Sequence, residues 1–248
     1  MVHGLTDPSV GVHGAYVPVA VDPTVPVRPV FAGGAPHTVY LNRDGATLTG
    51  GTDDAAHNVS SIVGGNGPGM ATIPRAKFSD EDWLKVVSCV ADEFWRFNIQ
   101  IVTDRPKTPG YMMAMIGGAA SDLGQPQGVG GIAPIDKMSC RIIEGAIVYA
   151  FSESVGNNPI VSCEIAAQEI GHAFSLDHEL LASDPMTYLP YTGHRTFQDQ
   201  DVDCGESTPR PCSCMREKQN SVKILADKVG LFSDPDGPNV NISSPENG

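Results

Sequence analysis

One stretch of the chain brings together side chains that could bind a metal ion and move a proton. It reads Gln168-Glu169-Ile170-Gly171-His172-Ala173-Phe174-Ser175-Leu176-Asp177-His178. On a helix, Gln168 and His172 project from one face, one turn apart, with Glu169 beside them. His178 can reach the same point only if the chain leaves the helix sharply near Ser175. The pattern predicts a metal site with an open coordination position and an adjacent carboxylate that takes a proton from bound water.

The elements that must position these residues follow from the local sequence. Asn158 and Pro159 form a helix start, and we expect a helix over 159–174. Another helix is expected over 79–97, because Ser79 precedes three acidic residues and then apolar residues at helical spacing. Strands are expected in five apolar, β-rich segments: 37–42, 98–103, 111–116, 128–135 and 146–151.

Three further segments complete the expected fold. Glycines break the segment 128–135, which is typical of an edge strand. Residues 49–74 are mostly glycines and polar residues and predict a long loop, whereas 222–232 predicts another amphipathic helix. We therefore expect an α+β protein: a twisted, mostly parallel sheet of about five strands, backed by the two longer helices.

The segment 168–178 resembles the zinc-binding signature of the metzincin metallopeptidases, H-E-x-x-H-x-x-G-x-x-H, and is most similar to the matrixin branch. Ser183-Asp184-Pro185-Met186-Thr187-Tyr188 resembles the Met-turn of that family, whose methionine lies beneath the metal. Gly131-Ile132-Ala133, followed by Cys140, resembles the upper-rim strand against which an extended substrate pairs. The helix at 79–97 matches the family's backing helix in order and position. The resemblance covers residues 37–192 and implies a metzincin-like (zincin) fold.

The resemblance also implies an activity, a cofactor and a set of site residues. The chain would be a zinc-dependent metalloendopeptidase, a hydrolase with one catalytic Zn2+ ion. Gln168, His172 and His178 would hold the metal. Glu169 would act as general base and then as proton shuttle.

Tyr188 follows the Met-turn methionine, Met186, by two positions. In several metzincin branches a tyrosine at this spacing binds the resting metal and then hydrogen-bonds to the developing oxyanion. The resemblance therefore implies a catalytic role for Tyr188. The alternative is that Tyr188 packs in the wall of a specificity pocket with Pro190 and Tyr191.

Two positions depart from the family signature. Gln168 stands where the family has histidine, and an amide oxygen is a weaker zinc ligand than imidazole. Ser175 stands where the family has a glycine that ends the helix in a left-handed conformation, which costs serine on the order of 1 kcal/mol. Gln168 has three interpretations: it binds the metal, another group replaces it, or the site is inactive. Four side chains close in sequence could replace it: Asp177, Glu179, Asp184 and His194.

Composition excludes several classes of protein. The chain is 41% hydrophobic and only 18% charged, which excludes wholesale disorder. A formal net charge of −13, without a Lys/Arg cluster, argues against a nucleic-acid partner or an anionic membrane. The apolar runs are too short to span a bilayer. The six cysteines favour an oxidising compartment, so we expect a secreted protein, although the chain begins without a signal-peptide pattern.

The expected organisation has four parts: an extended arm over 1–36, a catalytic subdomain over 37–178, a C-terminal subdomain with the Met-turn over 179–232, and a flexible tail over 233–248. The arm is either a flexible terminus or the remnant of a pro-segment lying across the rest. We expect Cys204, Cys212 and Cys214 to tie the C-terminal subdomain, although the sequence leaves the pairing open. A monomer would bind a polypeptide substrate extended along the edge strand. The alternative function is an inactive metzincin-like module that only binds a peptide or protein.

Overall fold

The computed structural model describes residues 13–20, 35–64, 69–232 and 240–241. In this part of the chain the protein is α+β, with seven strands in its main sheet in the order β1-β8-β9-β7-β2-β6-β10. The strands are β1 His13–Pro18, β2 His37–Asn42, β6 Ile99–Val102, β7 Met112–Ile116, β8 Val129–Ile135, β9 Ile147–Ala150 and β10 Val240–Asn241. Every neighbouring pair is parallel except β8 with β9. The predicted mostly parallel sheet and its five strands are confirmed, and β1 and β10 extend it.

Strand β8 does not lie at the sheet edge as the sequence predicts, because β1 pairs along its whole length. The register aligns Ala15 with Ile132 and Tyr16 with Ala133. Part of the arm predicted over 1–36 is therefore an edge strand, while residues 1–12 and 21–34 lie outside the described residues. Of the tail predicted over 233–248, only β10 is described.

The long loop predicted over 49–74 is wrong in part, because this region contributes to a second, three-stranded sheet in the order β4-β3-β5. Its strands are β3 Ala46–Gly50, β4 Val59–Ser60 and β5 Met70–Ile73. Strands this short give almost no alternating pattern, and their many polar residues are typical of a loop. Leu48 and Ile73 anchor the small sheet, since both side chains are fully buried.

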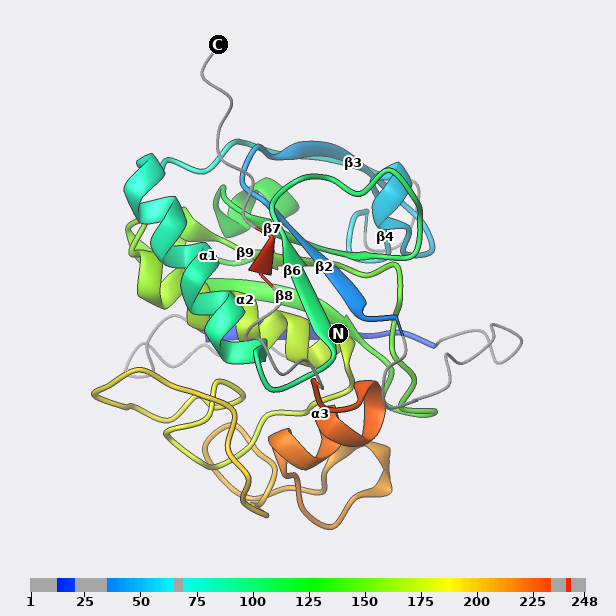
Figure 1. Ribbon diagram of the computed structural model, residues 1–248, viewed down its shortest axis with the longest axis vertical. Helices are drawn as coiled ribbons and strands as arrows, with labels where there is room; N and C mark the ends of the chain where they lie inside the picture. Colours follow the sequence, from blue (N-terminus) through cyan, green and yellow to red (C-terminus); the bar gives the residue numbers. More distant parts are fainter. Residues whose placement is uncertain (1–12, 21–34, 65–68, 233–239, 242–248) are drawn as a thin grey trace.

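Two long helices pack against each other on one face of the sheet (Figure 1). Helix α1 spans Asp80–Phe94, and its N-cap Ser79 accepts a hydrogen bond from the backbone N–H of Asp82 at 3.0 Å. Helix α2 spans Pro159–Ala173. A disulfide between Cys89 and Cys163 joins the two helices. Because α1 holds α2 from behind, the inner face of α2 is fixed relative to the sheet.

Residues 179–232 contain one longer helix, α3 Ser221–Val229, and long irregular segments at the foot of the molecule (Figure 1). Two disulfides secure this region: Cys204–Cys212 closes a short loop, and Cys140–Cys214 ties that loop to the segment after β8. The three disulfides are compatible with an extracellular protein. No helix among the described residues is long and apolar enough to cross a membrane.

Candidate metal centre and active site

Helix α2 supplies three of the predicted site residues from its last two turns. Its N-terminus is fixed by Asn158, whose side-chain oxygen accepts hydrogen bonds from the N–H groups of Ile160 and Val161 at 3.0 and 3.2 Å. The side chains of Gln168, Glu169 and His172 are all buried. This helix is apolar nearly all round, so its few polar side chains are held away from bulk water.

The chain leaves α2 at the predicted position. Ser175 has φ of 70°, in the left-handed region, and its hydroxyl donates to the carbonyl of Arg141 at 2.9 Å. Its own carbonyl accepts a hydrogen bond from Arg216 at 2.9 Å. The side-chain and backbone hydrogen bonds therefore hold serine in a conformation that usually favours glycine. This turn brings His178 back to His172.

The two histidines face each other through their outer ring nitrogens. Nε2 of His172 and Nε2 of His178 are 3.0 Å apart. Nδ1 of His172 lies 2.8 Å from the carbonyl of Leu176, and Nδ1 of His178 lies 3.1 Å from Oε1 of Glu206. A carbonyl and a carboxylate only accept hydrogen bonds, so each Nδ1 carries the proton and donates it. When both rings are neutral, each Nε2 has a lone pair directed at the other Nε2. A cation between the two nitrogens could accept both lone pairs.

The environment of the two rings favours the neutral form. Burial, and then the nearby His178, hold the pKa of His172 well below its usual range. Burial also lowers the pKa of His178, although Glu206 opposes the shift. Desolvation disfavours a charged ring more strongly than the neighbouring carboxylate stabilises it. Neutral imidazole is the form that binds metals.

The sequence interpretation missed Glu206, which holds the ring of His178, and Arg210, which holds Glu206. Arg210 donates to both Glu206 oxygens, at 3.1 and 2.7 Å, and to both Asp177 oxygens, at 2.8 and 2.7 Å. The Cys204–Cys212 disulfide closes the loop that carries Glu206 and Arg210. The clustered cysteines were the one sequence signal that this loop is fixed in place.

The Gln168 amide is held by the segment 185–187. Its Nε2 donates to the carbonyl of Pro185 at 2.8 Å and to that of Thr187 at 3.4 Å. Two carbonyl acceptors identify this end of the amide as the nitrogen. The carbonyl oxygen is consequently the atom of this amide that could serve as a metal ligand.

The four possible replacements for Gln168 are each engaged in other networks. Asp177 is held by Arg210, and Glu179 accepts from Gln219 and Ser221 at 2.9 and 3.1 Å. Asp184 accepts from the N–H groups of Met186 and Gln198, both at 2.8 Å. His194 lies 3.1 Å from Glu93 and 3.3 Å from Glu164. None of these contacts directs a side chain to the two histidines.

The Glu169 carboxylate is completely buried, and neither oxygen has a hydrogen-bond partner of good geometry among the described residues. Burial raises the pKa of Glu169 well above its usual range, and the backbone N–H of Ala15 opposes this only in part. Gly131 of β8 makes room for the carboxylate, since a Cβ there would lie 2.7 Å from Oε1 of Glu169. A buried carboxyl of this kind is suited to exchanging a proton.

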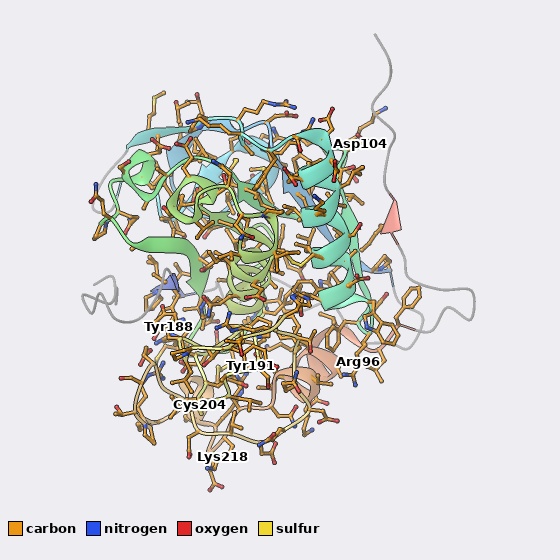
Figure 2. The ribbon with its side chains drawn as sticks, turned by 90° about the vertical axis from the view of Figure 1, so that its left-hand side faces the viewer. Arg96, Asp104, Tyr188, Tyr191, Cys204 and Lys218 are labelled. Atoms are coloured by element: carbon orange, nitrogen blue, oxygen red, sulfur yellow. A yellow bond between two sulfur atoms is a disulfide. The ribbon has the colours of Figure 1, made fainter. Side chains whose placement is uncertain are left out.

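The segment 183–188, which resembles a Met-turn in sequence, packs against α2. Met186 is completely buried, and a Cβ at Gly171 would lie only 2.7 Å from its sulfur. Tyr188 is also buried, and its ring centroid is 4.2 Å from that of His178. Tyr191, by contrast, is 42% exposed. Figure 2 labels both tyrosines in the same region as Cys204.

A strand from the arm covers this site. The ring of Tyr16, in β1, lies 5.1 Å from the ring of His172 and 4.9 Å from that of His178, measured between centroids. The edge of β8 predicted to bind substrate is therefore occupied by the chain's own backbone. Neither Tyr16 nor this pairing was predicted, because an isolated tyrosine in a Pro/Gly-rich segment carries no periodic signal.

Within the described residues, no group of three or more His, Cys, Asp and Glu side chains is arranged to hold a metal ion. The two facing histidines would need a ligand of another kind, and Gln168 is the candidate that the helix provides. No known family model matches the chain, and no curated protein matches it either.

Proposed function

We propose that this protein is a metal-dependent endopeptidase of the metzincin kind, with His172, His178 and the amide oxygen of Gln168 as ligands of one zinc ion. The observation that carries the proposal is the 3.0 Å approach of two Nε2 atoms, each in a ring whose Nδ1 donates to a fixed acceptor. Two ligands of a tetrahedral zinc ion, each about 2.0–2.1 Å from the metal, lie about 3.3 Å apart. The two rings therefore fit a metal with little movement.

The side chains around this pair suit peptide hydrolysis. A bound metal of this type polarises a carbonyl and lowers the pKa of water. Glu169 would take the proton from the attacking water and deliver it to the leaving amine. Tyr188, packed on His178, would donate a hydrogen bond to the oxyanion. Burial raises the pKa of Tyr188 well above its usual range, so the phenol keeps the proton that it must donate.

The substrate would lie extended along β8 and bind through backbone hydrogen bonds. Strand β1 occupies that edge and must leave before a substrate can enter. The full chain is therefore expected to be less active than a form in which β1 is weakened. We further propose a secreted monomer, since three disulfides suit an oxidising compartment.

A second candidate function is a peptide-binding module without catalysis. Two observations favour it: Gln168 is already held by the Met-turn carbonyls, and an extended strand already fills the cleft. In that case the fold would retain peptide binding along β8, and the facing histidines would not hold a metal.

Metal content and proteolysis, measured on the same samples, test the proposal. The samples are the wild type, His172→Ala, Glu169→Gln and, as a control, His57→Ala, whose side chain is 71% exposed. We expect His172→Ala to lose zinc. We expect Glu169→Gln to keep zinc but to cleave an unfolded protein about 10²–10⁴-fold more slowly. The control should match the wild type.

Three outcomes would contradict the proposal in different ways. Stoichiometric zinc in His172→Ala would remove the metal assignment. Unchanged cleavage by Glu169→Gln would mean that another group activates the water. A wild type that binds zinc but cleaves nothing, even after the Tyr16→Ala change that weakens β1, would favour the binding module.

A further inference from the structure

The space that Tyr16 fills is shaped for an aromatic ring. Two histidine rings border it, and only 2% of the Tyr16 residue is exposed. Tyr16 is aligned with Ala133 of β8, whose small side chain leaves room for a large neighbour on that face. A peptide lying along β8 in the same register would therefore direct one side chain into this space.

The far end of the space is polar: it holds Lys137 and Arg210, and Arg210 is paired with the carboxylates of Asp177 and Glu206. Lys137 donates a hydrogen bond to the phenol oxygen of Tyr16, and its Nζ lies 3.8 Å from the ring centroid. Arg210 approaches the same oxygen, with Nη2 at 3.5 Å. An ammonium over an aromatic face is attracted to the ring, and the Lys137 donor at the hydroxyl favours phenol over a plain ring. Leucine or phenylalanine would leave Lys137 without this acceptor.

The space is continuous with open volume. A cavity of about 800 Å³ lies beside Tyr16, lined by Lys137, Glu206, Arg210 and residues 211–215. Its size is in the range of small-molecule and peptide sites. A side chain or backbone next to the ring could therefore continue into this cavity.

We propose that the space beside His172 and His178 is a recognition site for a phenolic side chain, and that the peptides bound along β8 are those that place a tyrosine there. Strand β1 is then the chain's own occupant of this site. The inference deepens the proposed function, on which it rests for the nature of the substrate. It can be tested without hydrolysis, since it concerns binding alone.

The test removes the Tyr16 side chain and adds small aromatic compounds that could take its place. Tyr16→Ala leaves a space that p-cresol, which has the ring and hydroxyl of tyrosine, should fill. We expect p-cresol to raise the Tm of Tyr16→Ala saturably, and toluene to bind at least about tenfold more weakly. The wild type, whose site is filled, should not respond to either compound. In Tyr16→Ala with Lys137→Met, the preference for p-cresol should fall.

A second measurement covers the case in which Tyr16→Ala does not fold. A labelled hexapeptide with the β1 sequence, His-Gly-Ala-Tyr-Val-Pro, is titrated into the metal-free Tyr16→Phe variant. This variant keeps the ring but lacks the hydroxyl, so its own strand competes less strongly for the site, and binding is followed by fluorescence anisotropy. We expect it to bind at least about tenfold more tightly than its Tyr→Phe and Tyr→Ala counterparts.

The outcomes separate this inference from the proposed function. Equal binding of p-cresol and toluene, or of the three peptides, would overturn the phenol site, because Tyr16 would then only anchor β1 by apolar packing. Tyrosine-selective binding without any proteolysis would support the site while the endopeptidase proposal fails. Proteolysis without tyrosine-selective binding would support the endopeptidase proposal while the phenol site fails.

Discussion

Replacing Gln168 separates its observed role, as a hydrogen-bond donor to the carbonyls of Pro185 and Thr187, from its proposed role as a metal ligand. In Gln168→Ala the carbonyl of Pro185 loses a donor at 2.8 Å, and that of Thr187 loses a longer contact at 3.4 Å. One good hydrogen bond contributes about 0.5–1.5 kcal/mol, and a buried acceptor left unpaired costs about 1–3 kcal/mol. We therefore expect the metal-free protein to lose about 1–3 kcal/mol of unfolding free energy.

The metal affinity of the same variants reports the other role. If the amide oxygen is a ligand, Gln168→Ala should weaken zinc binding by about 10–100-fold or more, since even lost outer contacts have that effect. Gln168→His should strengthen zinc binding, because imidazole is the better donor at the same place on the helix face. The loss of stability and the change of affinity are independent quantities, and both are measurable.

The assay is a zinc titration against a competing chelator, paired with urea unfolding of the metal-free protein. Gln200→Ala, at an exposed position, is the matched control and should change neither quantity. If Gln168→Ala loses stability but keeps its zinc affinity, Gln168 only holds the carbonyls of Pro185 and Thr187, and the ligand assignment is wrong. If the wild type binds no zinc and Gln168→His does, the native chain is a disabled peptidase, which would refute the proposed function.

Two further predictions concern groups around the site. In Gly171→Ala the new Cβ would lie 2.7 Å from the buried sulfur of Met186. Such overpacking costs about 1–3 kcal/mol, so we expect a lower Tm and weaker zinc binding. An unchanged Tm and zinc affinity would show that the segment around Met186 can move to accept the methyl group. Burial, and then Asp184 and Glu164, raise the pKa of Glu93 to about 9, so the native state binds more protons than the unfolded state between about pH 4.5 and 9. Its contribution to stability is therefore lost as the pH rises through that window, by at most about 1.4 kcal/mol per unit. Urea unfolding should show that Glu93→Gln gains stability over the wild type at pH 8 relative to pH 5, and an equal difference at both would contradict this.

The main elements could be predicted because their signals are local. Ser79 and Asn158 begin α1 and α2 as expected, and the five apolar segments form strands within a residue or so of the predicted bounds. The small sheet was missed because its strands have two to five residues, and backbone pairing rather than apolar alternation defines them. Strand β1 was missed for a related reason: its partner β8 is more than one hundred residues away, and nothing in its own sequence indicates that pairing.

The candidate site was predictable only where spacing on one element determines proximity. Gln168 and His172 share a helix face by periodicity, and the turn at Ser175 follows from the position of His178. Glu206 could not be predicted, because it reaches His178 through a loop whose position depends on a disulfide and on Arg210. Long-range contacts of this kind have no signature in a single sequence.

The arrangement around Gln168 bears on why glutamine could be retained at this position. A histidine on α2 could donate one hydrogen bond to the segment 185–187, whereas the Gln168 amide nitrogen reaches two carbonyls, those of Pro185 and Thr187. The glutamine therefore fixes the turn that carries Met186 and Tyr188 more firmly than an imidazole would. With glutamine in place of histidine, the expected zinc affinity is lower, but the hydrogen bonds to Pro185 and Thr187 keep this side of the cleft ordered. The cleft can therefore still hold an extended strand such as β1. A chain selected for peptide binding would tolerate this exchange fully, and an enzyme would tolerate it as long as zinc is abundant relative to the weakened affinity.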